Sequence, residues 1–300
     1  MPGTLSGTSL SNAVQRYDSL QAVLQKRMGN GLEGQVAYTY SKCLTNSVGY
    51  FGTGFGSTGA NSSGGQPGWE NQYDSHSMYG PCYWDQTHIF TGFVSYDLPF
   101  GRGKQFGHDM NPVVNALIGN WQIGGIMTVH SGNALTMNTF GGWANSQDPS
   151  DTAGISWYTL TDLPDCNGPI KILNQHVAAN PTTGTPAYIQ YFDTSNISYP
   201  APRAGELGHF GTCSVGDIRG PVLANFDLDV HKGFNFGETR RLEFRAEFLN
   251  AFNHPIWDFM GGPANGSFDP PGPGQTQANF GRITGSQGAR NIQLALKFYF

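Results

Sequence analysis

Seven segments of this 300-residue chain alternate between apolar and polar side chains at every second residue. In Thr239–Phe252, for example, Leu242 and Phe244 share one face while Glu243 lies on the other. A period of two is typical of β-strands that have one apolar and one polar face. The sequence therefore predicts an all-β protein built on these segments: Ser11–Arg27, Leu32–Leu44, Thr87–Phe100, Asn120–Thr136, Val222–Asn235, Thr239–Phe252 and Asn291–Phe300.

The connections between these segments alternate between short and long along the chain. The short or fairly short ones are Met28–Gly31, Gly101–Gly119 and Phe236–Glu238. The long ones, rich in Gly, Ser, Asn, Pro and aromatic residues, are Thr45–Gln86, Met137–Pro221 and Asn253–Gly288. Strands joined in this order place all short turns at one rim of a sheet and all long loops at the other. Outer-membrane β-barrels have this arrangement.

Two architectures share the observed periodicity, because a soluble β-sandwich buries its apolar face whereas a membrane barrel turns that face to lipid. The segments are longer than the ~5–6 residues typical of soluble strands. They are long enough to span a bilayer, which takes about 9–11 residues. Aromatic side chains near the segment ends suit the girdles of a membrane barrel: Tyr38, Tyr40, Tyr96, Phe100, Trp121, Phe298, Tyr299 and Phe300. The pattern favours the barrel.

Composition excludes several other classes of protein. Glycine occurs 42 times, and each glycine inside a helix costs about 1 kcal/mol, which argues against a helical bundle. Charged residues make up 12% of the chain and its net charge is −5, so no nucleic-acid partner is expected. No apolar run approaches the ~18 residues of a transmembrane helix. The first residues show no signal peptide.

The sequence contains no convincing catalytic or metal-binding motif. Gly54–Gly59 (GFGSTG) matches the dinucleotide-binding pattern, but it lacks the flanking strand and helix that the pattern requires. No HExxH motif is present, and no Gly-x-Ser-x-Gly stands between a strand and a helix. We therefore expect no enzyme, no cofactor and no metal. Aromatic residues in the long loops suit ligand contact or packing within the loops, and no ligand-contact residue can be chosen among them.

Six stretches of the chain resemble one known family in their order and sequence. They are Tyr38–Lys42 (YTYSK), Asp85–Phe106 (DQTHIFTGFVSYDLPFGRGKQF), Gly119–Gly132 (GNWQIGGIMTVHSG), Arg219–Phe234 (RGPVLANFDLDVHKGF), Arg241–Trp257 (RLEFRAEFLNAFNHPIW) and Phe280–Phe300 (FGRITGSQGARNIQLALKFYF). Together they resemble the C-terminal barrel of TonB-dependent outer-membrane receptors, in the Oar-like branch that usually carries an N-terminal carboxypeptidase-regulatory-like domain.

The resemblance implies an antiparallel up-and-down transmembrane barrel of about 22 strands, of which residues 1–300 would supply about seven. The plug and the N-terminal domains would be absent from this chain. The implied location is the outer membrane of a Gram-negative bacterium, with the long loops extracellular. The implied partners are outer-membrane lipid, the rest of the barrel and its plug, the TonB complex and the barrel-assembly machinery. The terminal aromatics Phe298 and Phe300 resemble the signal that this machinery reads.

The same barrel arrangement gives expectations for the cysteines and for one row of polar side chains. Four cysteines allow three disulfide pairings. In extracellular loops we expect Cys43–Cys82, at the two ends of one loop, and Cys166–Cys213, within another. The polar row expected to face the barrel lumen consists of Asp227, Asp229, His231, Glu243, Arg245 and Glu247.

Two hairpins allow predictions of register, because a slip by one residue would turn a whole strand face around. The first hairpin should pair Leu24 with Val36 across a three-residue loop, Gly29-Asn30-Gly31, with Gly31 left-handed. The hairpin at Phe236–Glu238 should pair positions whose numbers add to an even sum. A turn centred on Gly237 would place Asp229 opposite Arg245, and a shift by two would place Asp227 there instead.

Three functions remain open at this level. The first is part of a TonB-dependent receptor that takes up or translocates a large substrate. The second is a soluble secreted β-sandwich, either an adhesin or a carbohydrate-binding module, whose apolar face would be covered by a second sheet. The third is a passive porin-like channel, which would use the same strands without a plug.

Overall fold

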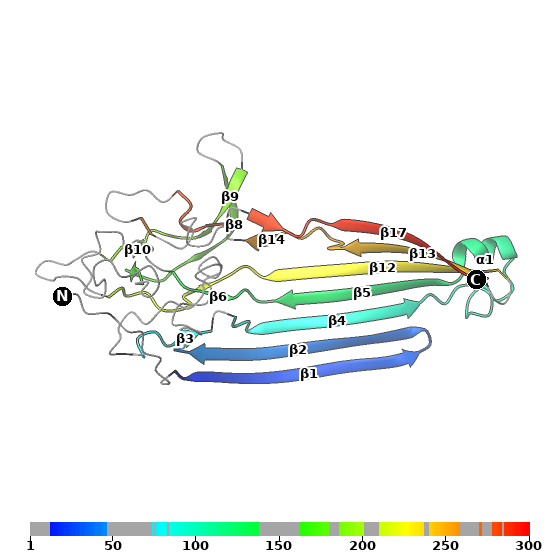
Figure 1. The fold of residues 1–300 in the computed structure, drawn as a ribbon, viewed down its shortest axis with the longest axis horizontal. Coiled ribbons are helices and arrows are strands. Elements are labelled where there is room, and N and C mark those ends of the chain that lie inside the picture. Colours follow the sequence, from blue (N-terminus) through cyan, green and yellow to red (C-terminus); the bar gives the residue numbers. More distant parts are fainter. Residues whose placement is uncertain are drawn as a thin grey trace, which may run out of the picture.

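A computed structural model describes residues 13–46, 74, 76–82, 84–137, 163–179, 186–200, 210–236, 240–258, 270–271, 278–283 and 285–300. Seven long strands lie side by side in chain order, and each is antiparallel to the next (Figure 1). They are β1 (Gln15–Gly29), β2 (Leu32–Thr45), β4 (His88–Asp97), β5 (Trp121–His130), β12 (Leu223–Phe236), β13 (Arg240–Leu249) and β17 (Asn291–Tyr299). All seven predicted strands are confirmed, with differences at their ends, of which the largest is in Asn120–Thr136, where β5 already ends at His130.

The register brings most of the apolar residues of the seven strands to one face of the sheet, which we call the apolar face. Leu20 pairs with Tyr40, Tyr96 with Ile123, and Phe244 with Leu296. The opposite face, the polar face, carries Gln, Thr, Ser and charged residues. Leu24 is 76% exposed and Leu294 is 69% exposed, so no layer of the described chain covers the apolar face at these positions.

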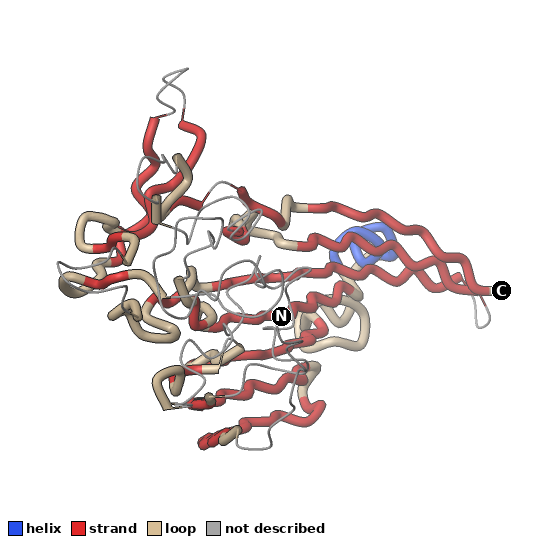
Figure 2. Tube along the Cα trace, turned by 60° about the vertical axis from the view of Figure 1, so that its left-hand side comes forward, coloured by secondary structure: helices blue, strands red, loops and turns tan. Residues whose placement is uncertain are grey.

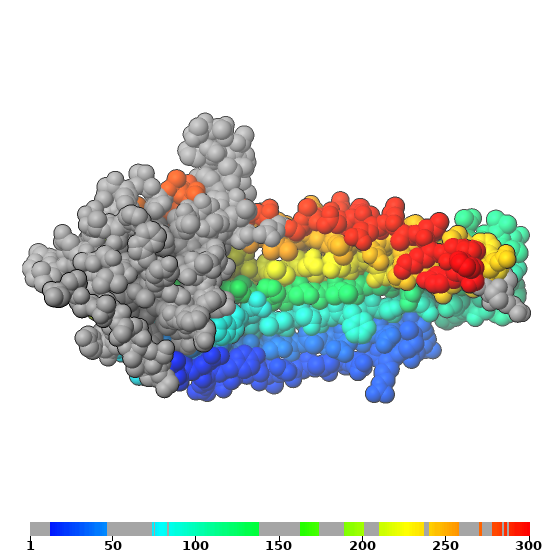
Figure 3. Space-filling view, viewed as in Figure 1, coloured from blue at the N-terminus to red at the C-terminus, as the bar shows by residue number. Residues whose placement is uncertain are grey.

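The sheet is open at both edges. Figure 3 shows one face of the sheet uncovered along most of its length. β1 and β17 form its two edges, and within the described residues neither pairs with a further long strand. The sheet is twisted, since in Figure 2 the strands near its two edges run in different directions. The described chain lacks the second sheet that a soluble sandwich would need over the apolar face.

The first hairpin has the predicted pairing and a different turn. Leu24 pairs with Val36 and Leu20 with Tyr40, as predicted. The predicted three-residue loop is wrong, because Gly29 pairs with Leu32 and only Asn30 and Gly31 lie between them. Both have positive φ, 55° and 79°, as a type I′ turn requires. An irregularity between Lys26 and Gly29 shifts the register by one residue, and this bulge restores the shared apolar face.

The hairpin between β12 and β13 has the predicted parity and a different register. Val230 pairs with Ala246, and His231 pairs with Arg245, so paired positions sum to an even number. The preferred prediction of Asp229 opposite Arg245 is wrong by two residues, and its alternative with Asp227 is wrong by four. A shift by two keeps every side chain on its face, so the apolar pattern does not distinguish these registers.

The long loops contain further short strands and the main hydrophobic core of the described chain. These strands are β3 (Gly80–Pro81), β6 (Ala134–Leu135), β7 (Asp165–Cys166), β8 (Ile172–Ala179), β9 (Pro186–Phe192), β10 (Ile197–Ser198), β11 (Ile218–Arg219), β14 (Ile256–Asp258), β15 (Arg282–Ile283) and β16 (Gly285–Gln287). Met78, Leu163, Phe192 and Phe280 pack in one buried cluster, although they come from three different loops. This end of the sheet, on the left in Figure 1, is the long-loop end.

The opposite end, the short-turn end, carries a single short helix among the described residues, α1 (Pro112–Ile118). It lies in the connection between β4 and β5 (Figure 1). Asn111 caps it, since its side-chain oxygen accepts a hydrogen bond of 2.9 Å from the Val113 N–H. Within the described residues, no helix has the length and apolar character needed to cross a membrane.

Candidate functional site: the polar face and the long-loop end

The six predicted polar-row residues lie together on the polar face of β12 and β13. Asp229 stands opposite Glu247, and His231 stands opposite Arg245. The sequence correctly grouped them, but the observed register brings two carboxylates face to face instead of the expected opposite charges.

Neighbours along the same strand balance the charges of this row. Asp229 Oδ2 lies 2.9 Å from His231 Nε2. On β13, Glu243 lies between Arg241, at 3.2 Å, and Arg245, which also donates to it. The Glu243 side chain is only 6% exposed, and a buried carboxylate needs such partners. Contacts between residues i and i+2 therefore replace the predicted cross-strand pairs.

Asp227 is used differently from the rest of the row. Its Oδ1 accepts hydrogen bonds from the backbone N–H of Asn250, at 2.8 Å, and from Asn225, at 3.0 Å. Asn250 has a positive φ of 49° where the chain leaves β13. Its side-chain Nδ2 donates a hydrogen bond to the His254 backbone oxygen, and its Oδ1 accepts one from the His254 backbone N–H. Asp227 thus holds the turn where the chain leaves the sheet.

The polar face also carries an apolar pair. Phe93 on β4 stands opposite Ile126 on β5, and they are 40% and 58% exposed. Ile126 interrupts the alternation of its strand, where Gly124 and Gly125 precede it. Exposed apolar side chains in the middle of a polar surface indicate a place where another molecule or domain packs.

A polar hollow of about 220 Å³ opens on the polar face at the short-turn end. Asp97, Gln122, His231 and Arg241 contribute to its lining, together with Lys104 from the connection after β4. Lys104 Nζ lies 3.7 Å from Asp97 Oδ2. Because acidic and basic side chains both line the hollow, it suits contact with a polar protein surface.

Both disulfides of the structure join the cysteines that the sequence analysis paired. Cys43 and Cys82 are bonded with their Cα atoms 5.4 Å apart, and Cys166 and Cys213 with theirs 4.8 Å apart. The first fixes the end of β2 to the loop that follows it, and the second joins two parts of the long connection between β5 and β12. Cys166, Cys213 and Asp217 lie close together, but both sulfurs are engaged in the disulfide and are not available as thiolate ligands.

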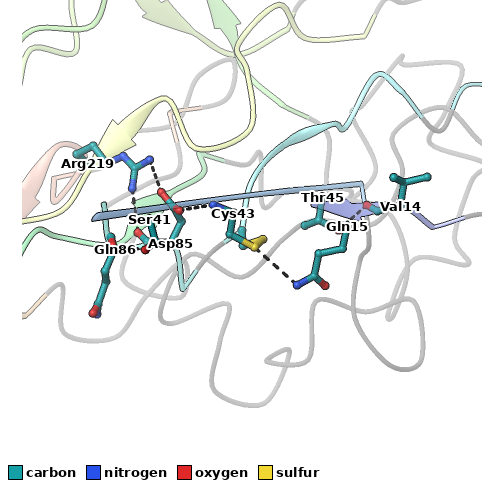
Figure 4. The surroundings of a disulfide bond; sticks show 9 residues. Val14, Gln15, Ser41, Cys43, Thr45, Asp85, Gln86 and Arg219 are labelled. Atoms are coloured by element: carbon teal, nitrogen blue, oxygen red, sulfur yellow. Dashed lines mark hydrogen bonds and ion pairs between the residues drawn. A yellow bond between two sulfur atoms is a disulfide. The ribbon is translucent and has the colours of Figure 1, made fainter. Parts of the chain in front are cut away.

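A buried ion pair beside the first disulfide joins two loops (Figure 4). Asp85 Oδ2 accepts a hydrogen bond of 2.6 Å from Arg219 Nη2, while its Oδ1 accepts one of 2.6 Å from the backbone N–H of Cys43. Arg219 Nη1 also donates to the Asp85 backbone oxygen at 2.9 Å. The Asp85 side chain is 1% exposed and that of Arg219 is 38% exposed.

The sequence analysis did not identify this ion pair. Both residues open stretches that carry the family resemblance, Asp85–Phe106 and Arg219–Phe234, and each stands just before a long strand. Two strands that start at the same rim bring the residues just before them close together. The matching positions of Asp85 and Arg219, each a few residues before a long strand, were therefore the sequence signal for this ion pair. Tyr191 adds a further link, since its hydroxyl donates to the Arg219 backbone oxygen at 2.5 Å.

The remaining candidates divide between described and undescribed residues. Phe298 and Phe300 form an exposed aromatic pair at the end of β17, with ring centroids 6.1 Å apart. Trp84 is 47% exposed in its loop. Gly54–Gly59 and the other loop aromatics of interest lie outside the described residues: Trp69, Tyr73, Tyr83, Trp143, Trp157 and Tyr158.

Comparison with known proteins agrees with the geometry of the sheet. No curated protein and no solved structure matches the chain. A family model described as an outer membrane beta barrel domain matches residues 4–293, nearly the whole length. Together with long antiparallel strands that separate an apolar from a polar face, this match establishes that the chain belongs to the outer membrane beta-barrel domain family.

Proposed function

We propose that this chain is the C-terminal part of the barrel of a TonB-dependent outer-membrane receptor of the Oar-like branch. In this role, the complete receptor takes up or translocates a large substrate across the outer membrane of a Gram-negative bacterium. The apolar face contacts lipid, the polar face lines the lumen, and the long-loop end is extracellular. The proposal includes no catalytic step, no cofactor and no metal.

The observation that carries the proposal is the two-faced sheet with unpaired edges. Backbone groups that face lipid without partners cost several kcal/mol each, so β1 and β17 need further strands beside them. About 22 strands, as in the receptors that the sequence resembles, close a barrel wide enough to hold a plug. We propose that a plug and N-terminal domains complete the receptor, and that the barrel-assembly machinery recognises Phe298 and Phe300.

The apolar pair on the polar face favours a plugged barrel over the passive porin-like channel. In an open channel, Phe93 and Ile126 would face water. A plug domain would cover them and would also meet the polar hollow at the short-turn end. The same strands would serve a passive channel, which is therefore the alternative that the experiment must exclude.

Conductance of the complete protein in planar lipid bilayers separates the two functions. A plugged receptor is expected to stay closed until urea unfolds the plug, whereas a passive channel conducts without denaturant. A second measurement is binding of the purified periplasmic domain of TonB, which a receptor should bind through its N-terminal part. Conductance without denaturant together with no binding of TonB would reject the receptor.

A further inference from the structure

Helix α1 exposes its apolar side chains and turns its polar one toward the protein. Val113 and Leu117 are 68% and 69% exposed, and no residue of the helix is buried. The only polar residue within it, Asn115, is half-buried, and its Oδ1 accepts a hydrogen bond of 2.7 Å from the Arg102 N–H. A helix that lies in water has the reverse distribution, with its polar side chains facing out.

The end of the helix is attached to the apolar face of the sheet. Trp121 stands on that face, paired with Lys232, and its indole Nε1 donates a hydrogen bond of 2.9 Å to the Leu117 backbone oxygen. Lys232 Nζ donates to the Gly119 backbone oxygen and lies 5.1 Å from the centre of the Trp121 ring. It also lies 5.2 Å from the centre of the Phe234 ring.

These contacts have the chemistry of a membrane boundary. Trp and Lys are enriched where a membrane protein passes from hydrocarbon to headgroups, because each has an apolar part and a polar end. Lys232 is only 2% exposed although it belongs to the apolar face, and it satisfies a carbonyl at the end of α1. The exposed side chains of α1 therefore continue the apolar face at its short-turn end.

We propose that α1 is an interfacial helix that lies in the membrane leaflet at the short-turn end, with Val113, Val114, Leu117 and Ile118 among the lipid chains. Helices that expose an apolar face bind at this depth through the apolar area they bury. The inference rests on the proposed function only in requiring that the apolar face of the sheet contacts lipid. It assigns the connection between β4 and β5 a second role as a lipid anchor.

Spin labels at single introduced cysteines test this placement in the complete protein, in vesicles of phosphatidylethanolamine and phosphatidylglycerol. The four cysteines of residues 1–300 are all in disulfides and do not compete for the label. Leu117→Cys reports on the helix, and Leu294→Cys reports on the apolar face of the sheet. His108→Cys is the matched control in the same connection, because its native side chain is 75% exposed and next to Asp109.

Relaxation by oxygen, which concentrates in lipid, is compared with relaxation by a water-soluble nickel complex. We expect the oxygen-to-nickel ratio at Leu117 to resemble that at Leu294 and to be severalfold higher than at His108. A lipid value at Leu294 with a water value at Leu117 would overturn the helix placement alone. Shielding of Leu117 from both reagents would overturn it in favour of a protein partner. Water values at both positions would reject the spanning sheet together with the inference.

Discussion

The Asp85 carboxylate joins two loops at the long-loop end. It is buried, and it binds Arg219 and the backbone of Cys43 at the same time. Asp85→Asn keeps the shape but removes the charge, so a partly buried Arg219 loses its counter-ion. Hydrogen bonds to charged groups contribute about 1.5–3 kcal/mol, and we expect a loss of about 2 kcal/mol in the free energy of unfolding.

Thermal unfolding followed by tryptophan fluorescence measures this loss in the complete protein. The matched control is Asp109→Asn, because Asp109 also accepts a hydrogen bond, from His108 at 3.0 Å, but is 96% exposed. Exposed pairs of this kind contribute about 0–1 kcal/mol, so the control should unfold close to the wild type. Equal effects of the two substitutions would show that the Asp85–Arg219 pair does not hold the loops.

Tyr191 predicts a dependence of stability on alkaline pH. Burial raises the pKa of its phenol from 10.0 to about 12. The folded state therefore favours the neutral phenol of Tyr191. This preference contributes fully to the free energy of unfolding below pH 10 and is lost as pH rises through about 12. Tyr191→Phe removes the hydrogen bond to Arg219 at 2.5 Å, which costs about 0.5–1.5 kcal/mol at neutral pH.

Denaturant unfolding of wild type and Tyr191→Phe at several pH values measures this effect. The wild type should lose more stability than the variant between pH 10 and about 12. If the free energy of unfolding fell equally with pH in the two proteins, the raised pKa of Tyr191 would be contradicted.

At the scale of elements, the register of β12 and β13 can be tested by engineered disulfides. Directly opposite side chains have Cβ atoms about 4.5–5.5 Å apart, whereas diagonal neighbours are about 7–8 Å apart. The pair H231C and R245C stands directly opposite in the structure and should oxidise readily. The pair D229C and R245C, opposite in the register that the sequence favoured, is diagonal here and should not. Non-reducing peptide maps identify the bonds, and a disulfide only in the second pair would restore the predicted register.

The comparison of sequence and structure separates what alternation can predict from what it cannot. All seven long strands and their shared faces followed from the period of two, because a slip of one residue would turn charged rows such as Glu243 and Arg245 to the apolar face. A shift by two leaves the faces unchanged, and the charge complementarity used to choose a register failed because Asp229 pairs with His231 along its own strand.

The missed elements are those without a readable period. The predicted segment Asn120–Thr136 includes β6, but not the break that separates it from β5 or its pairing with β11, which joins positions 134–135 to 218–219 across a long connection. The core of the loops gathers Met78, Leu163 and Phe280 from distant parts of the chain. Helix α1 has seven residues, too few to show a helical pattern, and its polar residue faces inward. Tertiary contacts decide such features, so they were beyond local reasoning.

At the scale of the whole molecule, the two edges of the sheet determine how this chain behaves by itself. β1 is exposed along almost its entire length, and β17 is exposed throughout. Their free backbone groups would face lipid or detergent without partners, at a cost of several kcal/mol each. Unpaired edges also recruit other strands, so copies of the isolated chain are expected to associate edge to edge.

We therefore expect that residues 1–300 expressed alone do not form a closed, heat-resistant barrel in detergent. The measurement is electrophoretic mobility with and without heating, because closed barrels resist unfolding by the detergent of the gel until they are heated. The complete protein should show the shift and the isolated chain should not. A heat-resistant monomer of the isolated chain would mean that its seven strands close on themselves. A soluble monomer that unfolds cooperatively in plain buffer would instead mean that the apolar face is covered, as in a sandwich.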